Sequence, residues 1–306
     1  MADIRIGISG WRYTPWRGDF YPEGLGQAHE LAFASRAVRA IEINGSFYAL
    51  QAPDRYAQWY RDSPDGFMFS VKGGRFITHT KRLRDIDSPL ANFFASGMFQ
   101  LKEKLGPFLW QFPPNFRFDP DLFEAFLDKL PRTGAQALAM AKHSDRRLHK
   151  PGYLDIPPGM RLRHALEVRH ESFVTAAFAN LLRRQKVALV VADTAGKWPY
   201  AEDLTADFVY IRLHGDAKLY ESGYSEQALD HWQQRIECWS HGKQADGAKT
   251  LSNAKPRPRK SRDVFCFFDN DVKVHAPYDA RALLRRLKLE DGLLTQPGVP
   301  VEDGLW

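Results

Sequence analysis

The sequence has little cysteine and no long apolar run. Cys238 and Cys266 are the only cysteines in 306 residues, and they form neither a CxxC pair nor a zinc-ligand spacing, so buried reduced thiols are expected. Nowhere do eighteen apolar residues run together, as a membrane-spanning helix would need. The first residues, MADIRIGISGW, lack the charged and apolar regions of a secretory signal. We therefore expect a soluble, cytoplasmic protein with no membrane partner.

Disorder of the whole chain is also excluded by composition. The chain is 44% hydrophobic and 26% charged, which is enough apolar material for a full core. Its formal net charge of +6 favours anionic partners, but it does not choose among nucleic acid, phosphate and carboxylate.

Eight segments have the length and apolar character of buried strands. They are residues 4–9, 40–44, 67–72, 107–112, 164–169, 187–193, 208–214 and 264–270. Helical spacing follows most of them, with Asp119, Ser172 and Ser225 expected as helix caps, and it is weakest after the sixth strand. Strand alternating with helix eight times predicts an α/β fold, a single closed (β/α)8 TIM-type barrel. A doubly wound sheet is the main alternative.

Aliphatic and polar residues alternate along these strands. The alternation is clear in residues 41–44, 166–169 and 209–214. Because side chains of a strand point alternately to its two faces, the aliphatic face should meet the helices and the polar face should point into the barrel. The polar residues come late in each strand, toward the carboxyl end, which we call the mouth and where barrel enzymes build their sites.

Residues 242–263 depart from this pattern. The segment is polar, interrupted by proline and rich in Lys and Arg, and it precedes the last strand, so it should emerge at the amino end of the barrel, opposite the mouth. We expect a basic flexible insertion in one barrel domain of residues 1–290, followed by a C-terminal tail of residues 291–306. A solvated loop is the simplest interpretation, and a nucleic-acid tether is the alternative.

Seven blocks carry a family resemblance. They read IGISGWRYTPWRGDFYP (6–22), IEINGSFY (41–48), FMFSVKGGRFITH (67–79), LGPFLWQFPPNF (105–116), ALEVRHESF (165–173), VYIRLHG (209–215) and FFDND (267–271). In order and across almost the whole chain, they resemble the signature blocks of the YecE-like family, a domain of unknown function that is similar to TIM barrels. The resemblance implies the barrel fold and supplies no established reaction. The family often carries paired asparagines in the last block, where this chain has Asp269 before Asn270.

The strand ends supply a ring of polar residues at the mouth. We expect catalytic roles for Glu42, Glu167, His170, Asp193 and His214. We expect substrate-binding roles for Trp11, Tyr13, Asn44, Tyr48, Lys72, Gln111, Arg169, Arg212, Asp269 and Asn270. A carboxylate would act as general base beside a histidine that titrates near neutral pH, and the arginines would hold a phosphate or carboxylate. The alternative for each residue is a packed layer of ion pairs, although burying so many charges is costly without a function.

Some members of this ring are also possible metal ligands. They are Glu42, Glu167, Asp193, His214 and Asp269. No HxH or HExxH spacing accompanies them, and the nearby Lys and Arg side chains would compete for the same carboxylates. A divalent metal is therefore possible but not favoured, no residue is assigned as a metal ligand, and the cofactor is left unassigned.

Three functions are compatible with this sequence. The first is an enzyme, a hydrolase among the options, acting at the mouth on a small anionic (phosphate- or carboxylate-bearing) or sugar-like molecule. The second is a nucleic-acid-binding or endonuclease-IV-like processing protein that uses its positive charge and residues 243–262. The third is a noncatalytic ligand-binding barrel. Because the basic segment and the mouth should lie at opposite ends, one oligonucleotide would hardly engage both, which favours the small molecule.

Overall fold

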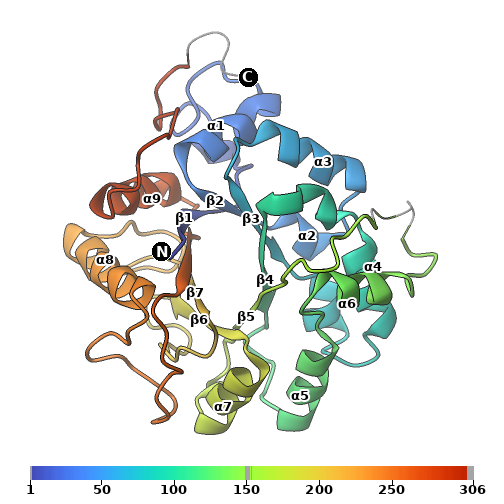
Figure 1. The fold of residues 1–306 in the computed structure, drawn as a ribbon. Coiled ribbons are helices and arrows are strands. Elements are labelled where there is room, and N and C mark those ends of the chain that lie inside the picture. The colour runs from blue at the N-terminus through green and yellow to red at the C-terminus, as the bar shows by residue number, and fades with distance from the viewer. Residues whose placement is uncertain (1, 149–151, 153, 302–306) are drawn as a thin grey trace.

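The computed structural model describes residues 2–148, 152 and 154–301. Eight parallel strands close into a barrel in chain order (Figure 1). Their bounds are β1 Ile4–Ser9, β2 Ala40–Ile43, β3 Met68–Lys72, β4 Leu105–Gln111, β5 His164–Glu167, β6 Ala188–Asp193, β7 Phe208–Leu213 and β8 Asp263–Phe268. The predicted segments agree with these strands to within two residues at each end. The TIM-type barrel is therefore confirmed over the doubly wound sheet.

Helices surround the barrel on its outer side (Figure 1). They are α1 Glu30–Ala37, α2 Gly45–Tyr48, α3 Pro53–Asp62, α4 Asp87–Ala95, α5 Pro120–Lys129, α6 Gly134–Ala141, α7 Ala176–Gln185, α8 Glu226–Ser240 and α9 His275–Arg286. Asp119 caps α5 and Ser225 caps α8, as predicted. The described residues between β6 and β7 form no helix, in line with the weak pattern there. None of the described helices is long and apolar enough to cross a membrane.

The start of α7 differs from the prediction. Glu171–Phe173 form a short 3-10 turn, and the helix begins only after Thr175, whose side chain accepts the capping hydrogen bond. Ser172 instead accepts a hydrogen bond of 2.7 Å from the backbone N–H of Phe118. The prediction that Ser172 caps this helix was wrong, because the turn separates it from the first helical residue.

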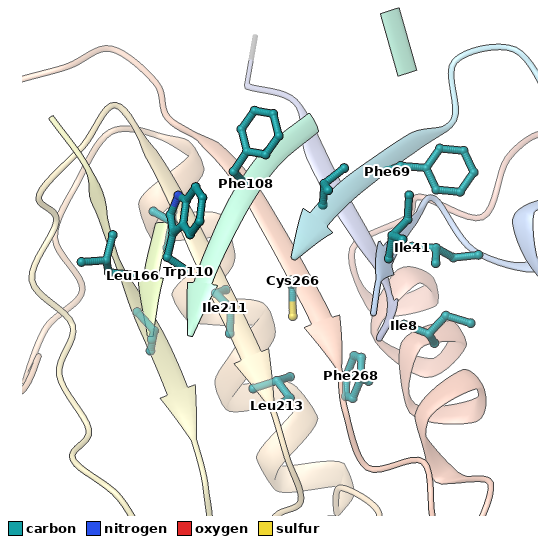
Figure 2. Close-up of a cluster of buried hydrophobic side chains, with 14 of the residues drawn as sticks. Ile8, Ile41, Phe69, Phe108, Trp110, Leu166, Ile211, Leu213, Cys266 and Phe268 are labelled. Carbon is teal, nitrogen blue, oxygen red and sulfur yellow. The ribbon is translucent and has the colours of Figure 1, made fainter. Parts of the chain in front are cut away.

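Strand parity divides the apolar core into two clusters. The larger cluster packs the outward faces of the strands against the helices, and Figure 2 labels part of it: Ile8, Ile41, Phe69, Phe108, Trp110, Leu166, Ile211, Leu213, Cys266 and Phe268. The smaller cluster fills the barrel interior and comprises Ala40, Leu109, Ala165, Ala188, Val190, Ala192, Ala206, Phe208, Tyr210, Phe265 and Phe267. The aliphatic face therefore meets the helices as predicted, and the polar positions of the upper strands point into the barrel.

The basic segment, residues 242–263, lies at the amino end of the barrel, where it leads into β8. Two buried carboxylates hold its middle part. The backbone N–H of Glu202 donates to the carbonyl of Lys249 at 2.8 Å, and the backbone N–H of Lys249 donates to the Glu202 carboxylate at 2.8 Å. The Asp203 carboxylate accepts a hydrogen bond of 2.6 Å from the backbone N–H of Leu251. The sequence predicted a solvated loop, and the structure adds these hydrogen bonds between the loop and buried carboxylates. The predicted flexibility of the segment stays a prediction.

The described part of the C-terminal tail returns to the outer layer. The backbone N–H of Leu294 donates to the carbonyl of Arg36 at 3.0 Å, and that of Gly298 donates to the carbonyl of Phe20 at 2.9 Å. The Thr295 hydroxyl donates to the carbonyl of Phe33 at 2.9 Å. The tail is thus anchored beside α1 and the loop after β1, on the outside of the barrel.

Candidate functional site

Arg212, on β7, is the centre of a buried ionic network at the mouth. Its guanidinium lies 2.9 Å from Glu42 on β2 and 2.6 Å from Glu167 on β5. It also lies 2.8 Å from Asp269, which follows β8. The side chain of Arg212 has 0% exposure, so a planar cation with several donors balances charges that closure of the barrel brings together.

The charges of this network lower the pKa of two of its carboxyl groups, those of Glu167 and Asp269. Burial alone would raise the pKa of Glu167, but Arg169 and Arg212 outweigh it and hold that pKa well below its usual value. Burial would likewise raise the pKa of Asp269, and Arg212 with His214 lowers it instead. The three carboxylates in turn raise the pKa of Arg212 against the effect of burial.

Hydroxyl groups complete the coordination of Glu42. Ser9 donates to one carboxylate oxygen at 2.6 Å, and Tyr210 donates to the other at 2.7 Å. Asn44 donates to the Ser9 hydroxyl at 3.1 Å, which links the network to the end of β2. Glu42 is fully buried and both its oxygens are engaged, so its surroundings are those of a structural anchor.

His214 belongs to the same buried network. Its Nδ1 atom lies 2.9 Å from Asp269 and lowers the pKa of that carboxyl, and its Nε2 atom lies 3.9 Å from Glu167. Tyr220 packs edge-on against the ring at a centroid distance of 5.3 Å. The histidine is therefore enclosed between carboxylates and an aromatic side chain, away from the open mouth.

Arg169 joins the network to the mouth. Its Nε atom donates to Glu167 at 2.7 Å, and its Nη2 atom donates to the Tyr220 hydroxyl at 3.3 Å. Its guanidinium carbon lies 3.8 Å from the ring centroid of Trp198, which is a close cation–π contact. Arg169 is thus paired and stacked, although one edge still faces the mouth cavity.

A cavity of about 1250 Å³ opens at the carboxyl ends of the strands. We call it the mouth cavity. Its wall comes from the loops after β1, β2 and β3, from α1 and α3, from the last residue of β4, and from residues after β5, β7 and β8. The predicted residues that line it are Trp11, Tyr13, Asn44, Tyr48, Lys72, Gln111, Arg169 and Asp269. A cavity of this size at this end of a barrel is the usual place of a ligand site.

Lys72, the last residue of β3, presents its ammonium group to the mouth cavity. Its side chain is 8% exposed, and its Nζ atom lies 4.7 Å from the ring centroid of Phe47. Within the described part of the chain, Nζ forms no hydrogen bond and no ion pair. Burial and the positive charge of Arg212 lower the pKa of Lys72 to about 8, although Glu42 acts against them.

Two buried polar atoms of the cavity wall have no hydrogen-bond partner among the described residues. They are the indole N–H of Trp11, a donor, and the side-chain oxygen of Asn44, an acceptor. Buried polar groups are nearly always satisfied, so this donor and this acceptor leave hydrogen-bonding capacity on the cavity wall that a bound molecule could use.

The remaining predicted residues lie off the cavity wall. Glu42, Glu167, Arg212 and His214 form the network beneath it. His170 accepts a hydrogen bond of 3.0 Å from the backbone of Ser172. Asp193 accepts one of 3.1 Å from Tyr224. Asn270 donates to Asp279 at 2.8 Å. The partners Ser172, Tyr224 and Asp279 lie after β5, after β7 and in α9, so these three side chains have structural roles outside the cavity wall.

The carboxylates that the sequence suggested as possible metal ligands surround a cationic side chain of the protein itself. The Arg212 guanidinium occupies the point where Glu42, Glu167 and Asp269 converge. Among the residues that the structure describes, no three or more His, Cys, Asp or Glu side chains are grouped so that they could hold a metal ion.

Comparison of the chain with known proteins shows its family and agrees with the fold. Residues 5–302 match the family described as "Protein of unknown function DUF72". The chain belongs to the DUF72 family. Over 130 residues it is 32% identical to the UPF0759 protein YecE of Escherichia coli K12, a match that covers 42% of this chain and 44% of that relative. A match to the UPF0759 protein YunF of Bacillus subtilis 168 is 31% identical over 121 residues and covers 37% and 41%. The chain thus matches less than half the length of these relatives.

Solved DUF72 structures have the same fold. A DUF72 protein of Thermotoga maritima superimposes with a TM-score of 0.67 at 23% identity, covering 94% of this chain and 99% of that one. A DUF72 protein of Enterococcus faecalis gives a TM-score of 0.65 at 18% identity, covering 94% and 96%. At these identities the likeness shows the fold alone.

Several residues of this DUF72 mouth cavity were missed by the sequence analysis. Asp271 lines the cavity, and burial together with Asp269 raises its pKa to about 6. His79 lines it as well, and burial together with Lys72 lowers its pKa to about 4. Arg12 and Arg75 also line the cavity. All four lie inside the quoted sequence blocks but beyond the strand ends, so a rule based on strand ends passed over them.

Proposed function

We propose that this DUF72 barrel is an enzyme that acts on a small molecule carrying an anionic group and hydroxyl groups, bound in the mouth cavity. The observation that carries the proposal is Lys72, a nearly buried cation that opens into a large cavity and has no carboxylate partner among the described residues. A buried charge is costly unless it is paired, and a ligand anion would supply the missing partner.

Two further cations support an anionic ligand. Arg12 and Arg75 line the mouth cavity and are exposed. Neither guanidinium forms a hydrogen bond or an ion pair with another described residue, so both are free to bind a phosphate or carboxylate. Arg212, which we expected to do this from the sequence, is instead engaged by three carboxylates and does not line the cavity.

The unsatisfied polar atoms support a ligand with hydroxyl groups. The Trp11 indole N–H can donate to a hydroxyl oxygen, and the Asn44 side-chain oxygen can accept from a hydroxyl hydrogen. The aromatic side chains of Tyr13 and Tyr48 also line the cavity and offer flat apolar faces. This mixture of flat and polar surface suits a sugar-like molecule better than a purely apolar one.

Groups suited to proton transfer lie on the same wall. The pKa of Asp271 is raised to about 6, so a carboxyl there changes protonation near neutral pH and can act as a general acid or base. The pKa of His79 is lowered to about 4, so its ring is neutral at pH 7 and can accept a proton. These groups favour an enzyme over a noncatalytic binding barrel.

The proposal is tested by ligand binding measured with calorimetry. The probes are glycerol 3-phosphate, which carries phosphate and hydroxyl groups, with glycerol and inorganic phosphate as its two parts. We expect glycerol 3-phosphate to bind most tightly. Arg75→Gln should weaken its binding about 10- to 100-fold, because a hydrogen bond to a charged group contributes roughly 1.5 to 3 kcal/mol. Arg84→Gln removes an exposed charge outside the cavity wall and is the matched control. Equal affinity in all three proteins, or no binding of any probe, contradicts the proposal.

A second candidate function is binding of a polyanion at the amino end. A smaller cavity of about 180 Å³ there is lined by Arg161, Arg183, Lys186, Arg257 and Arg259, together with Asp207. The segments that contribute these cations lead into β5, β6 and β8, so they meet at the end of the barrel opposite the mouth. Arg161 pairs with Asp207 and Arg183 with Asp203. The other three cations have no ion pair among the described residues, so they can contact phosphates.

Salt-dependent binding of a single-stranded oligonucleotide tests this second function. The variant replaces Lys255, Arg257, Arg259 and Lys260 with Gln. We expect the slope of log affinity against log salt to fall by up to about 3, because each phosphate that a cation neutralises adds roughly 0.7 to the slope. An unchanged slope would remove nucleic acid from consideration as a ligand of this face.

A further inference from the structure

The backbone at Lys72 is held in a fixed position. The Ser46 hydroxyl donates to the Lys72 carbonyl at 2.7 Å, and the N–H of Gly73 donates to the carbonyl of Leu109 at 2.8 Å. A Cβ atom on Gly73 would lie 2.3 Å from the Trp110 ring, so this close approach requires glycine after the lysine. The lysine side chain therefore starts from a rigid strand end and is directed into the mouth cavity.

The ammonium group of Lys72 differs from the other cations of the upper barrel. Arg212 and Arg169 are bound to carboxylates, whereas Nζ of Lys72 contacts the Phe47 ring and has neither a hydrogen bond nor an ion pair within the described residues. With its pKa lowered to about 8, half of Lys72 is a neutral amine at pH 8. An ordinary lysine, with a pKa near 10.4, has a neutral fraction about a hundredfold smaller at that pH.

The carboxylates below Lys72 suit a covalent intermediate at the same nitrogen. Glu42, Asp269 and Glu167 each stabilise a positive charge on Nζ, and an iminium ion carries its positive charge there as well. We infer that Lys72 is a nucleophile that forms an imine with the carbonyl carbon of an aldehyde or ketone bound in the mouth cavity. The inference rests on the proposed function, because the same cavity must bind the rest of the ligand.

The covalent step is a condensation that releases water. Neutral Nζ of Lys72 attacks the carbonyl carbon, a C–N bond forms, and the carbonyl oxygen takes up the displaced proton to give a carbinolamine. The C–O bond then breaks, and the hydroxyl leaves as water with a proton from Asp271, which lines the same cavity. The products are a protonated imine, one water molecule and the Asp271 carboxylate, so atoms and charge balance without an oxidant or reductant.

Reductive trapping tests this inference on the whole protein. Wild-type protein is incubated at pH 8 with glyceraldehyde 3-phosphate, which carries a carbonyl and a phosphate, and with sodium cyanoborohydride to reduce any imine to a stable secondary amine. Intact mass and peptide mapping then locate the adduct. We expect labelling of Lys72 to be faster than that of exposed Lys142, because Nζ of Lys72 opens into the cavity that binds the aldehyde and its pKa is lowered to about 8. Labelling spread evenly over exposed lysines overturns the inference.

Two variants separate a nucleophile from a simple cation. Lys72→Arg keeps the positive charge but has no primary amine, so it should lose the adduct. Lys142→Arg is the matched control and should retain the adduct at Lys72. If wild-type protein binds glycerol 3-phosphate but is not labelled at Lys72, the imine is excluded and the proposed function stands. If neither probe binds, the proposed function fails and the imine fails with it.

Discussion

The two ends of this barrel both concentrate charge, but they do so in opposite ways. At the mouth, Arg212 and Glu42 are both 0% exposed and belong to one network of short contacts. At the amino end, Arg161 pairs with Asp207 while 57% of the arginine side chain remains exposed. A buried pair depends on each partner because the other cannot return to water, whereas an exposed charge is solvated whether or not it is paired. Burial, and not the number of charges, therefore decides which ion pairs are structural, and the buried pair of Arg183 with Asp203 at the amino end resembles the mouth network in this respect.

The largest expected effect comes from removing the central cation of the mouth. Arg212→Met leaves Glu42 and Asp269 without their main counter-charge, and we expect the free energy of unfolding to fall by about 3 to 5 kcal/mol. Arg161→Met, at the amino end, should cost less than Arg212→Met, because Asp207 keeps the positive charges of Arg163 and Arg259 nearby when Arg161 is removed. Urea unfolding of the two variants measures both values. Similar losses would mean that the two ends do not differ in the way described.

A smaller loss of stability is expected at Arg169, which lies between the buried network and the mouth cavity. Arg169→Met removes a counter-ion of Glu167 and a close contact with Trp198, but Glu167 keeps Arg212 at 2.6 Å. We expect a loss of about 2 kcal/mol, which lies between the cost of a fully buried pair and that of an exposed one. The measurement is urea unfolding with and without phosphate. Unchanged stability together with weaker phosphate binding would instead show that Arg169 mainly serves a ligand.

Most of the fold was predictable because it follows from local alternation. Polar and aliphatic residues alternate in every clear strand, and only one closure of eight parallel strands places all the aliphatic faces against helices. The cap of α7 was not predictable in the same way. Ser172 and Thr175 are both good caps by residue type, and the choice between them depends on the turn at Glu171–Phe173 and on the contact with Phe118.

The sequence predicted which strand-end residues gather at the mouth, but it did not predict the role of each residue there. Strand ends correctly indicate that Lys72 and Arg212 share the upper barrel. They do not show that Arg212 is enclosed by carboxylates while Lys72 is left without one, because this depends on distances of a few ångströms between side chains from different strands. Asp271 and His79 lie on loops, whose path over the mouth is set by tertiary packing and not by periodicity.

A carboxyl with a raised pKa gives the mouth a pH dependence opposite in sign to that of Asp207 at the amino end, whose pKa Arg161 lowers against the effect of burial. The pKa of Asp271 is about 6 in the folded protein and near 4 when unfolded, so its folded form holds a proton more tightly. Its contribution to stability therefore falls as pH rises from about 4 to 6. Asp271→Asn should be more stable than wild type at pH 7, by about 1 kcal/mol after allowance for partial exposure, and should lose this advantage at pH 4. Urea unfolding at both pH values, with exposed Asp291→Asn as control, checks the sign. A gain that is the same at both pH values would rule out titration of Asp271 as its source.

The smallest change in stability is expected for the basic segment itself. Lys255, Arg257, Arg259 and Lys260 are exposed, and the backbone attachments of this segment run through Lys249 and Leu251. Replacing the four cations with Gln leaves those hydrogen bonds in place, so the free energy of unfolding should change by less than about 0.5 kcal/mol. Urea unfolding at low and high salt measures it, and mutual repulsion among the four charges predicts any gain to be larger at low salt. A loss as large as that of Arg212→Met would show that this segment is a packed ionic structure like the mouth, and the contrast between the two ends would no longer hold.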